Sequence, residues 1–461
     1  MTTTVNDPSP SGEEPIAPPA PQVRPPRPAF AVSMLARRLH FLAGLSIAPF
    51  LAVLCLSGLA YAFTPQINDL FYAGEQSVTV QDGPVYPLSE QVRAALATRP
   101  ADTLGSVVTP AAPDAATQVV LSEPGLDSAE ARTVYVNPYT NHVTGDLVTV
   151  SGRPPAQQWL REFHGNLHLG EPGRLYSEFV ASWLPFVVLG GLVLWIGQRR
   201  RAKRLRALFL PETGQQPGRA RTRAWHGALG LWLAAGLLAV SVTGLTWSAY
   251  AGDRFDKAVA ALDGKSPSLT APPVTAPRGG QPISIDAALA IARAQGLKGA
   301  VTITPPAAEA KPFKVAETSD RLPIRKGSVA IDPYSGQVSA RLGWPDYPLL
   351  AKLTALGIAA HSGTLLGLAN QLVMALLALG TLVLLAFGYR MWWKRRPAGR
   401  RRAPAPPPVW RHLPWPVVAG AVVVVAAVGW AMPVFGVSLI AFIVLDGMIA
   451  TVTRQRQPDS A

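Results

Sequence analysis

The sequence predicts an α-helical polytopic membrane protein with about six transmembrane helices, two small α+β domains between them, and an internal duplication. Apolar residues make up 49% of the 461 residues, and they are gathered in blocks rather than spread evenly. Several blocks are long enough to cross a hydrocarbon core of about 30 Å. Basic runs flank these blocks, and the two halves of the chain repeat the same motifs in the same order.

Six apolar stretches are candidate spans, at residues 41–63, 176–197, 228–250, 372–389, 416–431 and 434–452. The last two are short, and we expect them to form a helical hairpin. The predicted organisation is a disordered tail (1–35), a first span (36–63), a first domain (64–175), a second span (176–197), a basic loop (198–224), a third span (225–250), a second domain (251–352), a fourth span with an outer extension (353–393), a Pro/Arg-rich linker (394–415), the hairpin (416–452) and a tail (453–461).

The distribution of positive charge predicts the orientation of the spans, because Lys and Arg mark the cytoplasmic side. The segments 1–38, 198–224 and 390–411 and the C-terminal tail hold 23 of the 42 basic residues. The loop 64–174 has 6 basic and 12 acidic residues. We therefore expect an inner-membrane protein with both termini cytoplasmic and both domains extracytoplasmic. The net charge of +14 is then a topology signal, and the expected partner is the lipid bilayer and not nucleic acid.

Three motifs occur twice and define the duplication. His40 precedes a Ser-Gly pair, Ser57 and Gly58, by 17 and 18 residues, and His226 precedes Thr243 and Gly244 by the same spacing. The segments VYVNPYTNHVTGDL (134–147) and VAIDPYSGQVSARL (329–342) both read as β-hairpins. The motif H-x-x-x-x-L-G at 164–170 matches H-x-x-x-L-L-G at 361–367.

Each predicted domain also contains one short helix. In the second domain, Ser284 is a candidate cap for an alanine-rich helix that runs to Ala294, and a strand, KGAVTITPP, follows it. A weaker equivalent in the first domain begins at Ser89. Within the spans, Ser57, Thr243 and Thr246 are interpreted as packing features whose hydroxyls bond their own helix.

The residue inventory restricts the chemistry. The single cysteine, Cys55, lies in the first span, so no disulfide, zinc site or iron–sulfur cluster can be built from cysteine. Motifs for serine hydrolases, zinc peptidases, ATPases and nicotinamide binding are not found. Any metal chemistry must therefore use histidines or carboxylates.

The R-R-L-H start of the first span, the D-P-Y-S-G-x-V hairpin, and the L-R-E-F-H-G-N-L-H-L-G-E-P-G and A-H-S-G-T-L-L-G segments resemble the PepSY-associated transmembrane family. The resemblance covers about residues 36–394. It implies two PepSY-like domains. It also implies a function like that of the family's haem-carrying inner-membrane ferric-siderophore reductases, although other members are known only as iron-regulated membrane proteins.

Four of the seven histidines form symmetric pairs at span ends. His40 and His226 are expected at the cytoplasmic ends, and His164 and His361 on the outer side. Haem b takes nitrogen ligands on both faces of its iron, from facing helices. The symmetry and the resemblance together predict two haem b groups, with these four histidines as iron ligands.

Other polar residues receive lesser roles. His168 would share a helical face with His164, but its repeat counterpart is Leu365, so a contact to a haem propionate or plain exposure is expected for it. His142 and His412 are expected in solvent. Candidate propionate contacts, which are equally explained as topology charges, are Arg37, Arg38, Arg161 and Arg223.

Two classes of function remain open at this stage. The first is transmembrane electron transfer from a quinol or a cytoplasmic flavoprotein to an extracytoplasmic acceptor, for which the resemblance suggests ferric siderophore. The second is a non-enzymatic regulatory or peptide- or protease-binding membrane protein, because PepSY-type domains elsewhere act as inhibitory pro-regions of peptidases.

Overall fold

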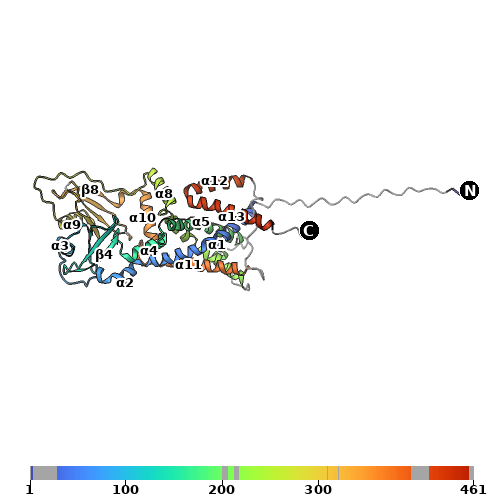
Figure 1. The fold of residues 1–461 in the computed structure, drawn as a ribbon, viewed down its shortest axis with the longest axis horizontal. Helices are drawn as coiled ribbons and strands as arrows, with labels where there is room; N and C mark the ends of the chain where they lie inside the picture. Colours follow the sequence, from blue (N-terminus) through green and yellow to red (C-terminus); the bar gives the residue numbers. More distant parts are fainter. Residues whose placement is uncertain are drawn as a thin grey trace.

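The protein is described from a computed structural model that covers residues 2–3, 28–199, 206–211, 218–308, 310–319, 321–395 and 415–455. Most of the predicted N-terminal tail, much of the basic loop 198–224, and most of the linker 394–415 with His412 lie outside these residues. The described chain has two parts, a sheet with short helices at one end and a bundle of long helices at the other (Figure 1).

Four long helices build the bundle: α1 (Pro28–Ala62), α5 (Glu171–Arg199), α7 (Arg219–Leu245) and α11 (Leu368–Trp393). In the described chain these four are the helices long and apolar enough to cross a membrane. They pack in the cyclic order α1, α5, α7, α11, with α11 returning to α1. Their apolar residues run around the whole helix surface, as expected for helices that face both lipid and neighbouring helices.

The other two predicted spans are α12 (Trp415–Ala431) and α13 (Pro433–Gln455), and the described apolar part of each is shorter. They form the expected helical hairpin, which packs against α5. The indole Nε1 of Trp183 on α5 donates to the hydroxyl of Ser438 at 2.8 Å, and Arg38 on α1 forms an ion pair with Asp446 on α13. The hairpin is therefore joined to the bundle by polar contacts in an apolar setting.

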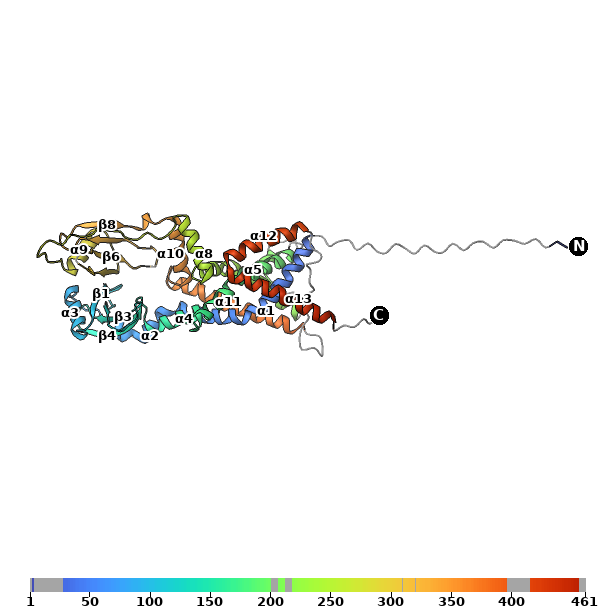
Figure 2. The same cartoon turned by 45° about the horizontal axis from the view of Figure 1, so that its top comes forward.

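Short helices connect the bundle to the sheet, and Figure 2 shows them between the two parts. These are α2 (Thr64–Gln76), α4 (Pro155–Asn166), α8 (Tyr250–Ala261) and α10 (Leu349–His361). A further one-turn helix, α6 (Arg206–Phe209), lies beside α7. The two halves of the chain have the same element order, with α1 to α5 matched by α7 to α11, so the duplication seen in the motifs extends to the fold.

The described strands form one antiparallel sheet in the order β4-β3-β2-β1-β5-β6-β7-β8. The bounds are β1 Thr103–Val108, β2 Thr117–Ser122, β3 Glu130–Val136, β4 Val143–Val150, β5 Val301–Thr304, β6 Phe313–Glu317, β7 Ser328–Ile331 and β8 Val338–Leu342. Both predicted hairpins are confirmed, as β3–β4 and β7–β8. The two repeats meet where β1 pairs with β5, with Val107 opposite Ile303. This pairing joins the strands of the two predicted domains and removes two exposed strand edges.

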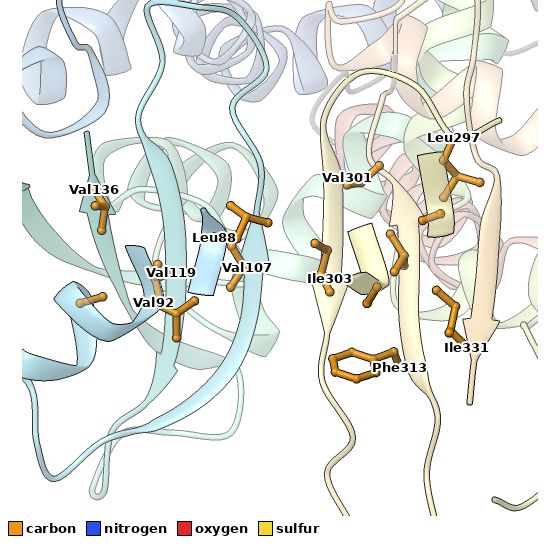
Figure 3. Packing of buried hydrophobic residues seen from close by; sticks show 14 of the residues in the cluster. Leu88, Val92, Val107, Val119, Val136, Leu297, Val301, Ile303, Phe313 and Ile331 are labelled. Atoms are coloured by element: carbon orange, nitrogen blue, oxygen red, sulfur yellow. The ribbon is translucent and has the colours of Figure 1, made fainter. Parts of the chain in front are cut away.

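Helices α3 (Leu88–Thr98) and α9 (Ile285–Ala294) pack on this sheet, and one apolar core runs through both repeats (Figure 3). As predicted, the hydroxyl of Ser284 caps α9 by accepting from the amide of Ala287 at 3.1 Å. Helix α3 begins one residue before the predicted Ser89. Its first amides, on Leu88 and Ser89, donate to the carboxylate of Asp286 at 2.6 and 3.3 Å, so the second repeat caps a helix of the first.

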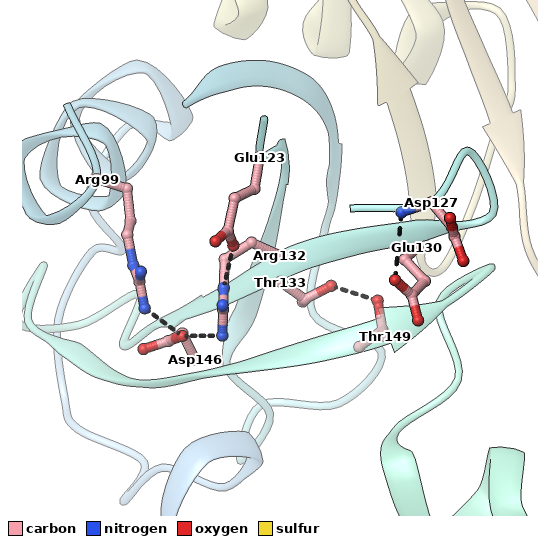
Figure 4. A network of polar contacts seen from close by, with 8 residues as sticks. All are labelled: Arg99, Glu123, Asp127, Glu130, Arg132, Thr133, Asp146 and Thr149. Atoms are coloured by element: carbon pink, nitrogen blue, oxygen red, sulfur yellow. Dashed lines mark hydrogen bonds and ion pairs between the residues drawn. The ribbon is translucent and has the colours of Figure 1, made fainter. Parts of the chain in front are cut away.

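A polar network ties together the strands of the first repeat (Figure 4). Arg132 on β3 donates to Glu123 on β2 at 2.8 Å and to Asp146 on β4 at 3.0 Å. Arg99, after α3, donates to the same Asp146 at 2.7 Å. The hydrogen bond from Arg132 lowers the pKa of Glu123. This network holds three strands and one helix end in register and lies away from the paired histidines.

Candidate functional site

Two pairs of histidines lie close together, one pair within the bundle and the other on two of the short helices. The first pair is His40 on α1 and His226 on α7, whose ring centres lie 6.1 Å apart at an interplanar angle of 72°. The Nδ1 of His40 lies 2.8 Å from the carbonyl oxygen of Val187, and the Nδ1 of His226 lies 3.1 Å from that of Leu384. Because a carbonyl oxygen only accepts, both Nδ1 atoms carry the proton. In the neutral form of each ring, Nε2 then keeps a free lone pair.

The second pair is His164 on α4 and His361 on α10, whose ring centres lie 6.4 Å apart. Hydroxyls replace carbonyls here. The Nδ1 of His164 lies 2.9 Å from Oγ of Ser57, and that of His361 lies 2.8 Å from Oγ1 of Thr243. Each hydroxyl donates to a carbonyl of its own helix, so its oxygen is left to accept from the ring N–H. The Nε2 atoms of this pair are again left with a lone pair.

A glycine on a neighbouring helix lies against each of the four rings. A Cβ atom added to the glycine would lie 2.9 Å from Cε1 of His40 at Gly191, 3.0 Å from Cε1 of His164 at Gly58, 3.5 Å from Cε1 of His361 at Gly244 and 3.9 Å from Cε1 of His226 at Gly388. At Gly191 and Gly58 the absence of a side chain lets the ring pack closely on a helix backbone, whereas at Gly244 and Gly388 an added methyl would make an ordinary contact. The first two glycines thus help to determine where the rings of His40 and His164 lie.

The duplication includes the surroundings of the pairs. Gly191 follows His164 by 27 residues, and Gly388 follows His361 by the same number. Because Ser57 and Thr243 are also equivalent, each histidine has the same kind of partners in both repeats. Each pair takes one histidine from each repeat, so neither repeat can form a pair alone.

A cavity of about 470 Å³ lies at the first pair, between α1, α5, α7 and α11. Its wall is mostly apolar and includes both histidines of the pair. Four arginines also line it, Arg37, Arg219, Arg223 and Arg395, and none of the described lining residues is an Asp or Glu. Burial, and then repulsion from Arg219 and Arg37, lowers the pKa of Arg395. This cavity therefore combines an apolar interior with positive charge that an anionic group can balance.

The donor set fits a flat, metal-centred ring with acidic substituents. Ring centres about 6 Å apart would leave room for one metal ion between the two imidazoles, at metal–nitrogen distances of about 2 Å. Both pairs have this spacing. Metal-bound histidines usually donate their other N–H to an oxygen, which all four do here. The residues present would therefore fit a haem, with the two imidazoles as its ligands and the arginines beside its propionates.

The second pair lies outside the four long helices, and its protonation state suits the same role. Burial lowers the pKa of His164 to about 4, with a further contribution from His361, and burial also lowers the pKa of His361 to about 4. Both imidazoles are therefore neutral at pH 7, which a metal ligand requires.

The remaining candidate residues lie elsewhere. Helix α4 ends at Asn166, so His168 does not share a helical face with His164; its ring packs on Trp159 at 4.9 Å and its Nδ1 lies 3.2 Å from Glu162. His142 is exposed in the β3–β4 turn. Arg161 is exposed on α4.

Sequence reasoning misassigned or missed several site residues. Arg38, a candidate propionate contact, forms an ion pair with Asp446 and is not among the residues that line the cavity. Ser57 and Thr243 were expected only to bond their own helices, but each also bonds a paired histidine. Gly191 and Gly388 were overlooked. The fixed 27-residue offset from His164 and His361 was the available signal for them.

Comparison with known proteins agrees with the architecture. No curated protein matches the chain. The family model described as the PepSY-associated TM region matches residues 37–395, which include all four paired histidines and the whole sheet. With its long apolar helices, the chain is a multi-pass membrane protein and belongs to the PepSY-associated transmembrane family.

Proposed function

We propose that this protein carries one haem b between His40 and His226 and a second between His164 and His361, and that it conducts electrons across the membrane. The observation that carries the proposal is the pair geometry, in which the two imidazole centres lie 6.1 Å apart in the first pair and 6.4 Å apart in the second, with every Nδ1 atom held by an oxygen. Bis-imidazole iron supplies one-electron exchange with little rearrangement.

The placement of the pairs supports transfer across the bilayer. His40 and Gly58, which contacts His164, are 18 residues apart on α1. At 1.5 Å per residue this is roughly 27 Å, close to the thickness of the hydrocarbon core. In the proposed arrangement, α1, α5, α7 and α11 would hold the two centres near opposite ends of the bundle.

The proposed orientation puts the first pair near the cytoplasm and the sheet on the extracytoplasmic side of the inner membrane, with both termini inside. In this arrangement α12 and α13 are the fifth and sixth spans. The basic residues beside the ends of the long helices support it. Reporter fusions after Gly105 and Pro305 should behave as extracytoplasmic, and fusions after Gly214 as cytoplasmic. The opposite result at Gly214 would reverse the direction of electron flow.

The proposed donor is a quinol or a cytoplasmic flavoprotein. The proposed acceptor is ferric iron, and the family resemblance supports a siderophore complex as its form. The two repeats of the sheet would then form the PepSY-like part that lies beside the exit centre. Ferric iron here is a substrate, so its binding residues are separate from the paired histidines.

The first test is a visible spectrum of detergent-purified protein. Sharp dithionite-induced α and Soret bands, with two haems per chain by pyridine haemochrome, are expected. A featureless spectrum from haem-supplemented cells would instead favour a regulatory or peptide-binding membrane protein.

The second test uses vesicles with donor on the cytoplasmic side, ferric chelate outside and a ferrous-trapping dye. The His164→Ala/His361→Ala double variant should insert and keep its first haem but lose ferrous production. His142→Ala, in the exposed turn, is the matched control and should behave as wild type. Undiminished ferrous production in the double variant would contradict the relay.

A further inference from the structure

The two pairs differ in the group that accepts the Nδ1 proton, and this difference is systematic. At the first pair both acceptors are backbone carbonyls, of Val187 and Leu384. At the second pair both are side-chain hydroxyls, of Ser57 and Thr243. Because the repeats place Ser57 and Thr243 at equivalent positions, the hydroxyl occurs on both sides of the second pair.

The acceptor on Nδ1 affects the basicity of Nε2. A strong acceptor draws the Nδ1 proton away and makes the ring a more basic ligand, which favours oxidised iron. Each hydroxyl donates its own proton to a helix carbonyl, at 3.2 Å to Leu54 and 2.8 Å to Ala239, and this donation strengthens its oxygen as an acceptor. Even so, a hydroxyl accepts more weakly than a peptide carbonyl, so its histidine remains the less basic ligand.

We propose that Ser57 and Thr243 are positioning residues that fix the tautomer of His164 and His361 and hold the reduction potential of the second centre above the value that carbonyl partners would give. The inference rests on the proposed function, because it assumes that iron lies between the rings. This contact biases an electron toward the second centre. The first centre has no side chain in the corresponding place, so substitutions can tune the second centre alone.

The two hydroxyls are not equivalent in their surroundings. The carbonyl of Leu54 also lies close to the His164 ring and acts on it as a second acceptor. His361 has Thr243 as its acceptor, and Trp247 packs on its ring at a centre-to-centre distance of 5.7 Å. The effect of losing the hydroxyl should therefore be larger at Thr243. The four arginines line the cavity at the first pair, so they affect the reduction potential of the first centre. Variants of Thr243 should leave that effect unchanged.

The test is a spectroelectrochemical titration of the full-length haem-loaded protein, with the second component assigned from its loss in the His164→Ala/His361→Ala variant. Thr243→Val should shift that component to a more positive potential and leave the other component unmoved. Thr243→Ser keeps the hydroxyl and should keep the wild-type potential. Ser57→Ala should give a smaller positive shift than Thr243→Val. Thr246→Val is the matched control, since the Thr246 hydroxyl donates to the carbonyl of Thr243 and its loss leaves the Thr243 hydroxyl in place.

The outcomes separate this inference from the proposed function. Protein without any haem spectrum overturns both. Two haems whose potentials are the same in wild type and Thr243→Val overturn the inference and leave the relay intact, as does a shift that appears at the first centre. If Thr243→Val lowers haem content, electron paramagnetic resonance of the retained fraction decides: unchanged g values for the second centre overturn the inference.

Discussion

The two repeats have the same fold but hold their histidines with different tightness. The histidines of the first repeat, His40 and His164, lie against Gly191 and Gly58, where an added Cβ would come within 2.9 and 3.0 Å of the ring. Those of the second repeat, His226 and His361, leave 3.9 and 3.5 Å at their glycines. Each pair thus combines one tightly seated ring with one that has room to adjust. We infer that one imidazole of each pair sets the position of a bound group, while the other can shift to complete the contact.

The largest expected effect comes from removing the ligands themselves. His40→Ala and His226→Ala should each remove one haem equivalent, and His164→Ala and His361→Ala the other, because a single imidazole cannot complete a bis-histidine centre. Pyridine haemochrome assays on purified protein measure the content. His168→Ala should retain both haems, since its ring packs on Trp159 away from the pair. Loss with His168→Ala and retention with His164→Ala would show that the wrong histidine was chosen.

Alanine at the four glycines tests the comparison directly. At Gly191 and Gly58 the added methyl must displace a ring, and we expect haem affinity to fall about tenfold, as for other changes around metal ligands. At Gly244 and Gly388 the methyl makes an ordinary contact, so affinity should stay near wild type. Haem titration of the apo-protein in detergent gives the four affinities. Equal losses at all four positions would remove the difference between the repeats.

The C-terminal hairpin has no counterpart within the repeats, and its ion pair should matter for stability. Asp446→Asn removes the carboxylate that pairs with the buried Arg38, and the expected cost is about 3 kcal/mol. Thermal unfolding in detergent should show a lower midpoint. Asp253→Asn, which breaks the exposed pair with Lys257 on α8, is the control and should change little. Stability recovered in Arg38→Met/Asp446→Leu would show that the cost of the single variant comes from removing one charge of the pair without the other.

The smallest effect concerns the caps that distinguish the two repeats of the sheet. Ser284→Ala removes the cap of α9 within its own repeat, and Asp286→Ala removes the acceptor for α3 in the other repeat. Each should cost about 1 kcal/mol. Hydrogen exchange should show faster opening of α9 in the first variant and of α3 in the second. Faster exchange of α9 alone in both variants would mean that Asp286 does not link the repeats.

The sequence by itself determined the elements and their repetition. Long apolar blocks predicted the four long helices, because a bilayer requires unbroken apolar helices of that length. The spacing of His40 and His226 from their Ser-Gly and Thr-Gly pairs predicted equivalent sites, and turn residues predicted both hairpins. These features are local, since each depends on residues that are near one another in the chain.

Only the tertiary structure decided which groups meet. The carbonyls of Val187 and Leu384 belong to the backbone, so no residue type announces that they will accept from His40 and His226. Pairing of β1 with β5 depends on two strand edges that the bundle brings together. The ion pair between Arg38 and Asp446 joins positions 408 residues apart, and sequence periodicity holds no information about such contacts. The chain thus specifies the histidines, while the packing of helices from both repeats turns them into pairs.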